Sequence, residues 1–204
     1  MNSRVQKIYF EYLAKLILET FVPSDYINLE LKDKPDLRMG DSIGIEVTRV
    51  LIDGEGQASG IFEHVRDNNF DSIDNRYLTT LDRIDYYLLQ KNGEIIGYGP
   101  TNAMVVDSSP LKNSFSNKLR KTYDMSSVDI FMFSPMREWF EKDCIEEFMV
   151  WTNINGGDAF RRIMVYEYPC LYLYESKQLR VINLDHDKCL QCIMEAKQYA
   201  VAQG

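Results

Sequence analysis

The stretch KPDLRMGDSIGIEVTR, residues 34–49, holds an acidic residue in the middle of an otherwise apolar, β-like run. Side chains alternate between the two faces of a strand, so residues two apart share a face. Glu46 therefore points away from the apolar residues on either side of it. The two faces divide into Ile43, Ile45, Val47 and Arg49 on one side and Gly44, Glu46 and Thr48 on the other. The acid does not belong to the apolar face and needs an explanation of its own.

A second acid, Asp36, follows a proline in the same stretch, and nine residues separate it from Glu46. If Asp36 lies on the neighbouring strand, the two carboxylates converge. Unpaired carboxylates at close range repel each other, and one of them takes up a proton. Mg²⁺ or Mn²⁺ relieves this repulsion, because such ions accept one or two carboxylates together with water and phosphate oxygens. The stretch therefore predicts a divalent-cation site at Asp36 and Glu46.

Helix-like and strand-like periodicities extend from this stretch toward both ends of the chain. Helices are predicted for segments with apolar residues on one side at about 100° per residue, and strands for segments that alternate. The predicted elements are a helix at 4–21, strands at 26–31, 36–39 and 42–51, a helix at 110–124, a strand at 128–134, a helix at 137–153, strands at 162–176 and 178–185, and a helix at 186–202. This order favours an α/β fold with a mixed central sheet flanked by helices.

The middle of the chain is harder to interpret. Residues 57–67 have a helical pattern, whereas 74–90 reads either as a helix or as part of a hairpin around Asn92-Gly93. We interpret it as a helix that runs into a short strand. We expect a single domain over residues 1–204, with its core at about 4–51 and 110–204 and an insertion at about 52–109.

Composition restricts the function classes. The 204 residues are 45% hydrophobic, and no apolar run approaches the roughly 18 residues that cross a membrane. We therefore expect a cytoplasmic protein without a membrane partner. The net charge of −8 argues against a broad, non-specific coat on nucleic acid, although a local basic groove is compatible with it. The oligomeric state stays open, a homodimer included.

The motif PDL…IEVT resembles the core motif of the PD-(D/E)xK nuclease superfamily, with Asp36 as the first acid and Glu46 as the second. More narrowly, GIEVTR followed by GEG and KLRKTY resembles uncharacterised bacterial and phage-type members. The resemblance in the order of elements runs from residue 4 to about 134. It implies a restriction-endonuclease-like core with an insertion after the third strand, Mg²⁺ or Mn²⁺ as cofactor, and nucleic acid as partner, with DNA expected by analogy alone.

Members of the superfamily often carry a further metal-binding Glu on the first helix. The candidates are Glu11 and Glu19. On a helical wheel Glu19 falls within the apolar face, near Leu16, whereas Glu11 falls about 120° away. We choose Glu19 as the third metal ligand. The alternative, weighed equally, is a Glu at the helix end that reaches water.

Thr48 stands where the superfamily motif ends in Lys. Arg49 is adjacent but lies on the opposite face. Some members supply this Lys from a following helix, and in the helix at 110–124 Lys118 falls within the arc of the buried face. A Lys on an inner face needs an anionic partner, and the two acids would provide one. We choose Lys118 as the catalytic lysine and hold Lys121 in reserve. The alternative is a Lys that extends along the helix to the solvent.

Other features favour ordinary structural roles. Cys189 and Cys192 follow His186 in a His-x-x-Cys-x-x-Cys spacing, but zinc needs a fourth ligand, so buried thiols are the preferred interpretation. Glu55 is expected to be an exposed loop residue. The alternating tyrosines between 166 and 174 are expected to pack in the core on one face of a single strand, with base stacking as the alternative.

The sequence thus predicts a metal-dependent nuclease that hydrolyses phosphodiester bonds. Asp36, Glu46 and Lys118 would act in catalysis, and Glu19, Asp36 and Glu46 would hold the metal ion. The alternative is a catalytically inactive protein with a nuclease fold that serves in binding or interaction. The missing Lys at position 48 and the acidic net charge favour this alternative. The position of Lys118 discriminates between the two.

Overall fold

The computed structural model describes residues 3–52, 54–101, 107–134 and 142–204. The chain divides into two compact units, which are described separately. The first comprises Met1–Val50 and Asp107–Gly204, and the second comprises Leu51–Val106. The second unit covers nearly the same residues as the insertion expected from the sequence.

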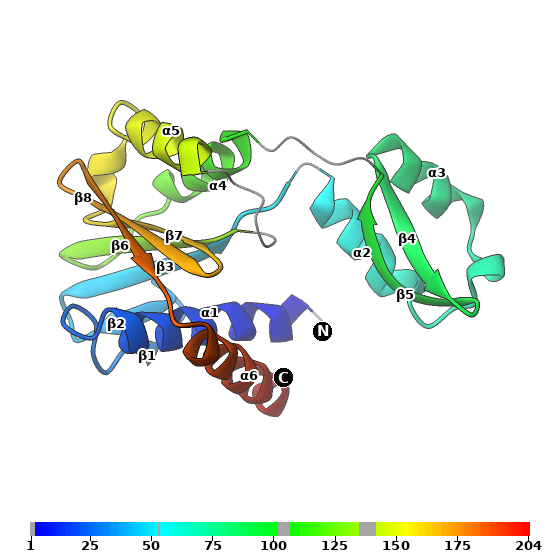
Figure 1. The fold of residues 1–204 in the computed structure, drawn as a ribbon, viewed down its shortest axis with the longest axis horizontal. Helices are drawn as coiled ribbons and strands as arrows, with labels where there is room; N and C mark the ends of the chain where they lie inside the picture. The colour runs from blue at the N-terminus through cyan, green and yellow to red at the C-terminus, as the bar shows by residue number, and fades with distance from the viewer. Residues whose placement is uncertain (1–2, 53, 102–106, 135–141) are drawn as a thin grey trace. The chain divides into compact units, whose positions relative to one another are not determined.

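The first unit is built on a seven-stranded mixed sheet (Figure 1). Its strand order is β1-β2-β3-β6-β7-β8-β9. Strand β3 pairs in parallel with β6, and β6 pairs in parallel with β7, whereas the outer pairs are antiparallel. The strands are β1 (Glu30–Leu31), β2 (Leu37–Met39), β3 (Ile43–Arg49), β6 (Ser127–Phe133), β7 (Ile163–Glu167), β8 (Cys170–Glu175) and β9 (Gln178–Asn183).

Helices cover both faces of this sheet (Figure 1). On one face α1 (Ser3–Phe21) packs against α6 (His186–Gln203). These two helices and the inward side chains of the strands form one apolar core. On the other face lie α4 (Ser109–Leu119) and α5 (Lys142–Thr152), joined by ring contacts such as Phe115 with Phe148. The expected α/β fold with a mixed, helix-flanked sheet is confirmed at this level.

Strand β3 shows why the sheet has two different faces. Ile45 and Val47 enter the core beneath α1, as the period of two predicts. Arg49 shares their face, and its guanidinium lies 5.7 Å from the centre of the Phe10 ring on α1. Glu46 is directed to the opposite face, where α4 lies. The sheet therefore presents an acid to the helix that carries Lys118.

The predicted long strand at 162–176 is wrong, because it is a hairpin of β7 and β8. The two strands pair antiparallel across a turn at Tyr168-Pro169. Proline lacks the N–H group that a central strand uses for its ladder, which favours a turn at this position. The turn also divides the tyrosines. Tyr166 on β7 lies in the core with α1 and α6, whereas Tyr174 on β8 faces away and donates a hydrogen bond to Asn153.

A buried charged group connects β6 to the segment after α1. The Asp129 carboxylate is fully buried and accepts a hydrogen bond from the Tyr26 hydroxyl at 2.6 Å. The Arg161 guanidinium donates to both of its oxygens, at 2.8 and 2.5 Å. Such a paired arrangement offsets the desolvation of the buried charge. Asp129 is therefore structural, and it lies on the apolar-core face rather than on the face of Glu46.

The second unit packs two helices against one hairpin. Its elements are α2 (Glu55–Val65), the 3₁₀ turn η1 (Phe70–Ser72), α3 (Asn75–Arg83), β4 (Tyr86–Lys91) and β5 (Glu94–Pro100). The ambiguous segment at 74–90 is thus both a helix and the first hairpin strand. Asp74 begins α3 by accepting a hydrogen bond from the Arg76 N–H, and Asn92 and Gly93 form the hairpin turn with positive φ angles.

Within the described residues, no helix is long and apolar enough to cross a membrane.

Candidate active site

The β2–β3 hairpin places Asp36 and Glu46 next to each other. Leu37 pairs with Ile45, and continuing this register by one residue sets Asp36 across from Glu46. Asp36 Oδ2 accepts a hydrogen bond from the Val47 N–H at 2.8 Å. Both acids are buried, with 6% of Asp36 and 1% of Glu46 exposed. Two carboxylates are therefore fixed in one place with little access to water.

Two lysines at the C-terminal end of α4 reach Glu46. Lys118 Nζ lies 2.5 Å from Glu46 Oε1 and 3.3 Å from the Val47 carbonyl oxygen. Lys121 follows the last residue of α4, and its Nζ also lies 2.5 Å from Glu46 Oε1. The structure thus brings Lys118 to Glu46, together with the reserve candidate Lys121. The two ammonium groups come from 72 and 75 residues away in sequence.

The structure brings Glu11, and not Glu19, to Asp36. Glu11 is 9% exposed, and its carboxyl is hydrogen-bonded to that of Asp36. Glu19 instead accepts hydrogen bonds from Lys15 Nζ and from the Leu29 N–H, both at 2.7 Å. The two acids are eight positions apart, which is about 12 Å along a helix. A helical wheel ranks positions around the axis and ignores this axial distance, which decides which acid meets the hairpin.

Tyr123 is a further residue at this place that the sequence did not single out. Burial, followed by the nearby charge of Glu46, raises the pKa of its phenol. The hydroxyl therefore keeps its proton near neutral pH. An aromatic residue in the loop after α4 carries no pattern that would mark it. Only the return of this loop to the sheet places it beside Glu46.

Glu11, Asp36, Glu46, Lys118 and Lys121 are called the acid–lysine site below. Burial raises the pKa of Glu46, but hydrogen bonds from Lys118 and Lys121 outweigh this and hold it below its usual value. Burial lowers the pKa of Lys121, and its bond to Glu46 more than compensates. Glu46 is therefore ionised and the Lys121 ammonium group stays charged.

The other two acids compete for a proton. Burial, and then the charge of Glu46, raise the pKa of Asp36, while the hydrogen bond from the Val47 N–H opposes the rise. Burial and the charge of Asp36 raise the pKa of Glu11 to about 7, with Lys7 opposing. Close carboxylates resist simultaneous ionisation. Near neutral pH the Glu11–Asp36 pair therefore takes up and releases a proton.

This raised pKa has a measurable consequence for stability. Glu11 holds its proton in the folded state up to a pH of about 7, whereas an unperturbed Glu loses it near 4.5. The folded state therefore binds more protons between these values, and the free energy of unfolding falls as the pH rises through them. We expect Glu11→Gln to reduce this fall by about 1–3 kcal/mol. Chemical denaturation between pH 4 and pH 8 measures it.

The matched control for this prediction is Glu19→Gln. Glu19 lies on the same helix but contacts Lys15 and Leu29 rather than Asp36, so its replacement should leave the fall that comes from Glu11 in place. Equal slopes for the wild type and the Glu11→Gln variant would contradict the assigned contact between Glu11 and Asp36.

The oxygen donors of the site suit a hard divalent cation. Asp36 interacts with both Glu11 and Glu46, and Mg²⁺ and Mn²⁺ prefer carboxylate oxygens as ligands. In the part of the chain that the structure describes, however, no three His, Cys, Asp or Glu residues are spaced to hold a metal ion as they stand. Two ammonium groups engage Glu46 Oε1 instead. The donor chemistry thus fits a cation, whereas the present arrangement is closed by ion pairs.

Two sequence expectations outside this site have clear outcomes. Glu55 is not an exposed loop residue, because it begins α2, is 5% exposed and accepts a hydrogen bond from the Ile52 N–H. Cys189 and Cys192 are buried on α6 within the apolar core. Among the described residues they join no group that could hold a metal ion. The buried-thiol interpretation agrees with this placement.

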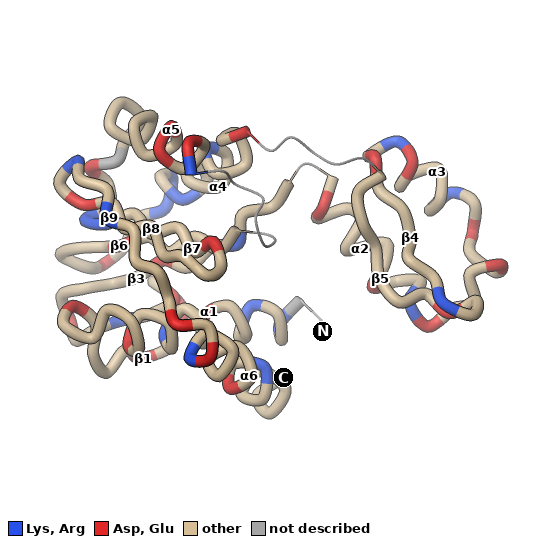
Figure 2. Tube along the Cα trace, viewed as in Figure 1, with Lys and Arg blue, Asp and Glu red and all other residues tan. Residues whose placement is uncertain are grey.

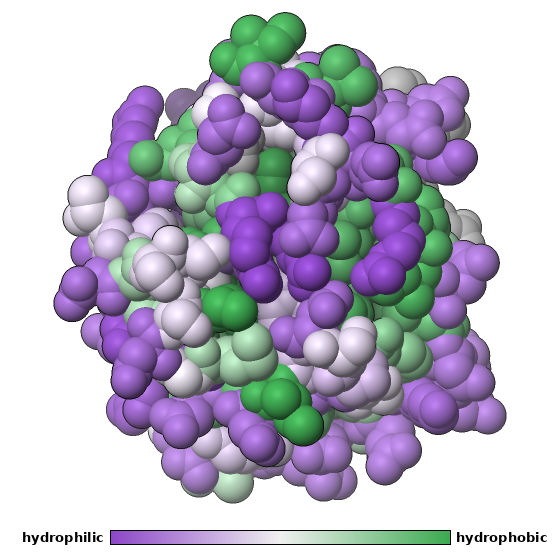
Figure 3. All heavy atoms as spheres, turned by 90° about the vertical axis from the view of Figure 1, so that its left-hand side faces the viewer, coloured by the Kyte–Doolittle hydropathy of each residue, from purple (hydrophilic) through white to green (hydrophobic). Residues whose placement is uncertain are grey.

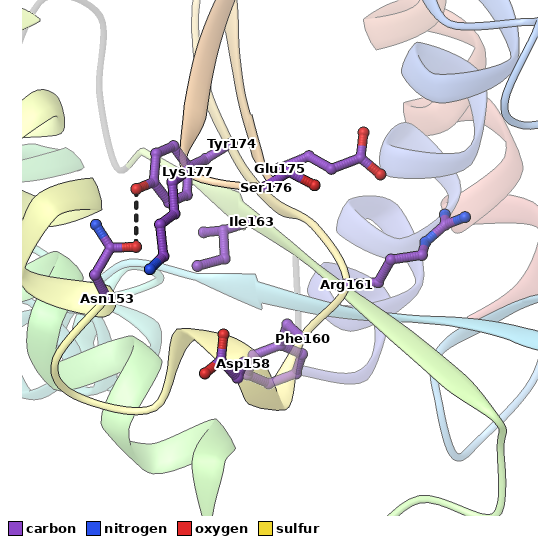
Figure 4. A pocket seen from close by; sticks show the side chains of 9 residues that line it. All are labelled: Asn153, Asp158, Phe160, Arg161, Ile163, Tyr174, Glu175, Ser176 and Lys177. Carbon is purple, nitrogen blue, oxygen red and sulfur yellow. Dashed lines mark hydrogen bonds between the residues drawn. The ribbon is translucent and has the colours of Figure 1, made fainter.

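A separate cavity of about 350 Å³ lies beside β7 and the β8–β9 turn, and Figure 4 shows its walls. The Tyr174 hydroxyl donates to Asn153 Oδ1 on one wall at 2.9 Å. None of the acid–lysine site residues lines it. Its lining is Asn153, Asp158, Phe160, Arg161, Ile163, Tyr174, Glu175, Ser176 and Lys177. Arg161 is already paired with Asp129, so Lys177 is the other basic side chain on the lining.

The charge distribution places basic groups near the site despite the net charge of −8. Lys118, Arg120 and Lys121 lie at and just after the end of α4, and Figure 2 shows both basic and acidic residues near this helix. On the face shown in Figure 3, hydrophilic and apolar residues are mixed. Two of these three basic side chains, Lys118 and Lys121, are paired with Glu46.

Comparison of the chain with protein-family models, with curated proteins and with solved structures gave no match.

Proposed function

We propose that this protein is a divalent-cation-dependent phosphodiesterase that cleaves nucleic acid, with DNA as the expected substrate by analogy with the superfamily. One observation carries the proposal. A lysine from a distant helix, Lys118, lies 2.5 Å from the buried Glu46 carboxylate. It contributes an ammonium group on the face where Thr48 leaves the motif without one. In this proposal the catalytic residues come from two places in the chain: Lys118 from α4, and Asp36 and Glu46 from the β2–β3 hairpin.

The cation would be held by Asp36 and Glu46, with Glu11 in the role first assigned to Glu19. When bound, such a cation acidifies a water ligand and neutralises charge on the scissile phosphate. The order α1-β1-β2-β3-α4-β6, with β3 and β6 parallel, supports the proposal, because it agrees with the core expected from the resemblance.

The residues of the chain have distinct tasks in this proposal. Lys118 directs its ammonium group at the attacking water and at the negative charge that grows on the phosphate, a stabilisation often worth 10²–10³-fold in rate. The Val47 N–H fixes the orientation of Asp36. The low exposure of both acids keeps competing water away.

The second candidate function is a binding protein that keeps this fold without the chemistry. The observation that favours it is the closed ion-pair set, in which Lys118 and Lys121 already neutralise Glu46. A purely structural ion pair would look the same. The two functions differ in what happens when Mg²⁺ or Mn²⁺ is added.

The test of the proposed function is a cleavage assay on single-stranded DNA, double-stranded DNA and RNA, with and without Mg²⁺ or Mn²⁺. We expect cleavage of at least one substrate with the cation and its loss after chelation with EDTA, because the acids alone provide no activated water. Mass-spectrometric detection of the new phosphate and hydroxyl ends would exclude a contaminating activity of different chemistry. Intact substrates under every cation, together with nucleic-acid binding, would favour the inactive alternative.

A further inference from the structure

Two ammonium groups share one oxygen atom in the acid–lysine site. Lys118 Nζ and Lys121 Nζ each lie 2.5 Å from Glu46 Oε1. A carboxylate oxygen offers about two lone-pair positions, so these contacts use both of them. Glu46 Oε1 therefore has no position left for a cation while both lysines are in place.

The charges of the site already balance without a cation. Glu11, Asp36 and Glu46 provide three acidic groups. Lys118 and Lys121 offset Glu46, and Lys7 lies 3.5 Å from Glu11. Mg²⁺ and Mn²⁺ bind carboxylate oxygens at about 2.0–2.2 Å, close to where the ammonium groups now lie. Both lysine contacts are to Oε1, so a cation could still reach Glu46 Oε2. Two further positive charges there would lie beside two ammonium groups, and this repulsion favours release of one of them.

The surroundings decide which lysine leaves. The Lys118 side chain is 17% exposed, belongs to the body of α4 and also donates to the Val47 carbonyl oxygen. The Lys121 side chain is 43% exposed and lies beyond the last residue of α4. Lys121 reaches water by rotating its flexible stem, whereas Lys118 would lose two contacts in a more buried place.

We infer that Lys121 is an electrostatic latch on Glu46, released when a divalent cation binds and then available to hold a phosphate oxygen of the substrate. This inference rests on the proposed function and adds regulation of the same site. The two lysines then have different tasks. Lys118 stays beside the reacting groups. Lys121 leaves the Glu46 carboxylate and binds a phosphate of the substrate. Until the cation binds, Lys121 helps to neutralise the charge of the buried Glu46.

Isothermal titration of Mn²⁺ into the metal-free protein tests the latch. Lys121→Met keeps the length of the stem and removes the charge. We expect it to bind Mn²⁺ about tenfold more tightly than the wild type, because no ion pair has to be broken first. The matched control is Lys112→Met, since Lys112 lies on α4 itself and pairs with Glu147 at 2.7 Å. This control should bind Mn²⁺ as the wild type does.

Kinetics provide a second readout. With saturating Mn²⁺, Lys121→Met should raise KM for the nucleic acid several-fold and leave kcat within about threefold, because the released ammonium contacts a phosphate without joining the chemistry. Lys121→Gln serves as a second variant, and thermal melting verifies that each variant folds.

The outcomes separate the latch from the proposed function. If the wild type binds Mn²⁺ and Lys121→Met binds it equally or more weakly, the latch is wrong and the proposed function stands. If neither protein binds Mn²⁺ under any condition, the proposed cation site does not exist, and the inference about Lys121 is wrong as well. Tighter binding in Lys121→Met with an unchanged KM would overturn the phosphate-holding half of the inference.

Discussion

Replacing Glu46 with Gln should abolish cation-dependent cleavage, with a loss in kcat/KM of at least about 10³-fold. Glu46 is 1% exposed and is the acid on which Lys118 and Lys121 converge. Gln has nearly the same shape but no charge, so it neither binds the cation well nor holds the two ammonium groups. The matching substitution on the hairpin, Asp36→Asn, keeps an oxygen acceptor for the Val47 N–H and should cause a loss of similar size.

Two measurements keep this prediction separate from simple unfolding. Circular dichroism and thermal melting report whether the hairpin still folds, and Mn²⁺ titration reports whether the site still takes the cation. Glu19→Gln is the activity control, because its carboxylate lies with Lys15 and Leu29 rather than at the site. Retained cleavage in folded Glu46→Gln and Asp36→Asn proteins would remove both acids from the mechanism and the proposed function with them.

The hairpin acids could be found from the sequence because strand alternation is a strict local rule. It separates Glu46 from its apolar neighbours without knowledge of any other element. Lys118 could be found for a related reason, since the arc of buried positions on α4 includes it. Glu46 follows from the period of two in β3, and Lys118 follows from the helical period in α4.

Contacts that depend on the relative placement of elements were not accessible in this way. The choice of Glu19 over Glu11 failed because the wheel omits distance along α1, and only the docking of the hairpin on that helix determines which turn meets Asp36. Tyr123 was missed because it lies in a loop without periodicity. The sequence predicts one strand in place of the β7–β8 hairpin, because β-forming residues lie on both sides of Tyr168-Pro169 and outweigh the turn signal of a single proline.

The second large effect is expected for Lys118, which reaches Glu46 from α4. Lys118→Met should lower kcat by about 10²–10³-fold with a smaller change in KM, because its ammonium group lies beside Glu46 and the Val47 carbonyl oxygen, where the reacting groups would gather. Lys121 is the internal comparison. It contacts the same oxygen atom from a more exposed position, and its replacement should act mainly on KM.

A lysine introduced on β3 in the Lys118→Met variant tests whether catalysis needs Lys118 itself or any ammonium group on this face of the sheet. Thr48 is only partly buried and shares the face of Glu46, two residues further along β3, which is about 6–7 Å. A lysine at this position spans that distance. We therefore expect Thr48→Lys to restore about tenfold of the activity lost in Lys118→Met. Arg49→Lys should restore none, because that side chain lies over Phe10 on the other face. Equal rescue by both, or by neither in folded proteins, would mean that Lys118 does more than deliver a charge to this face of the sheet.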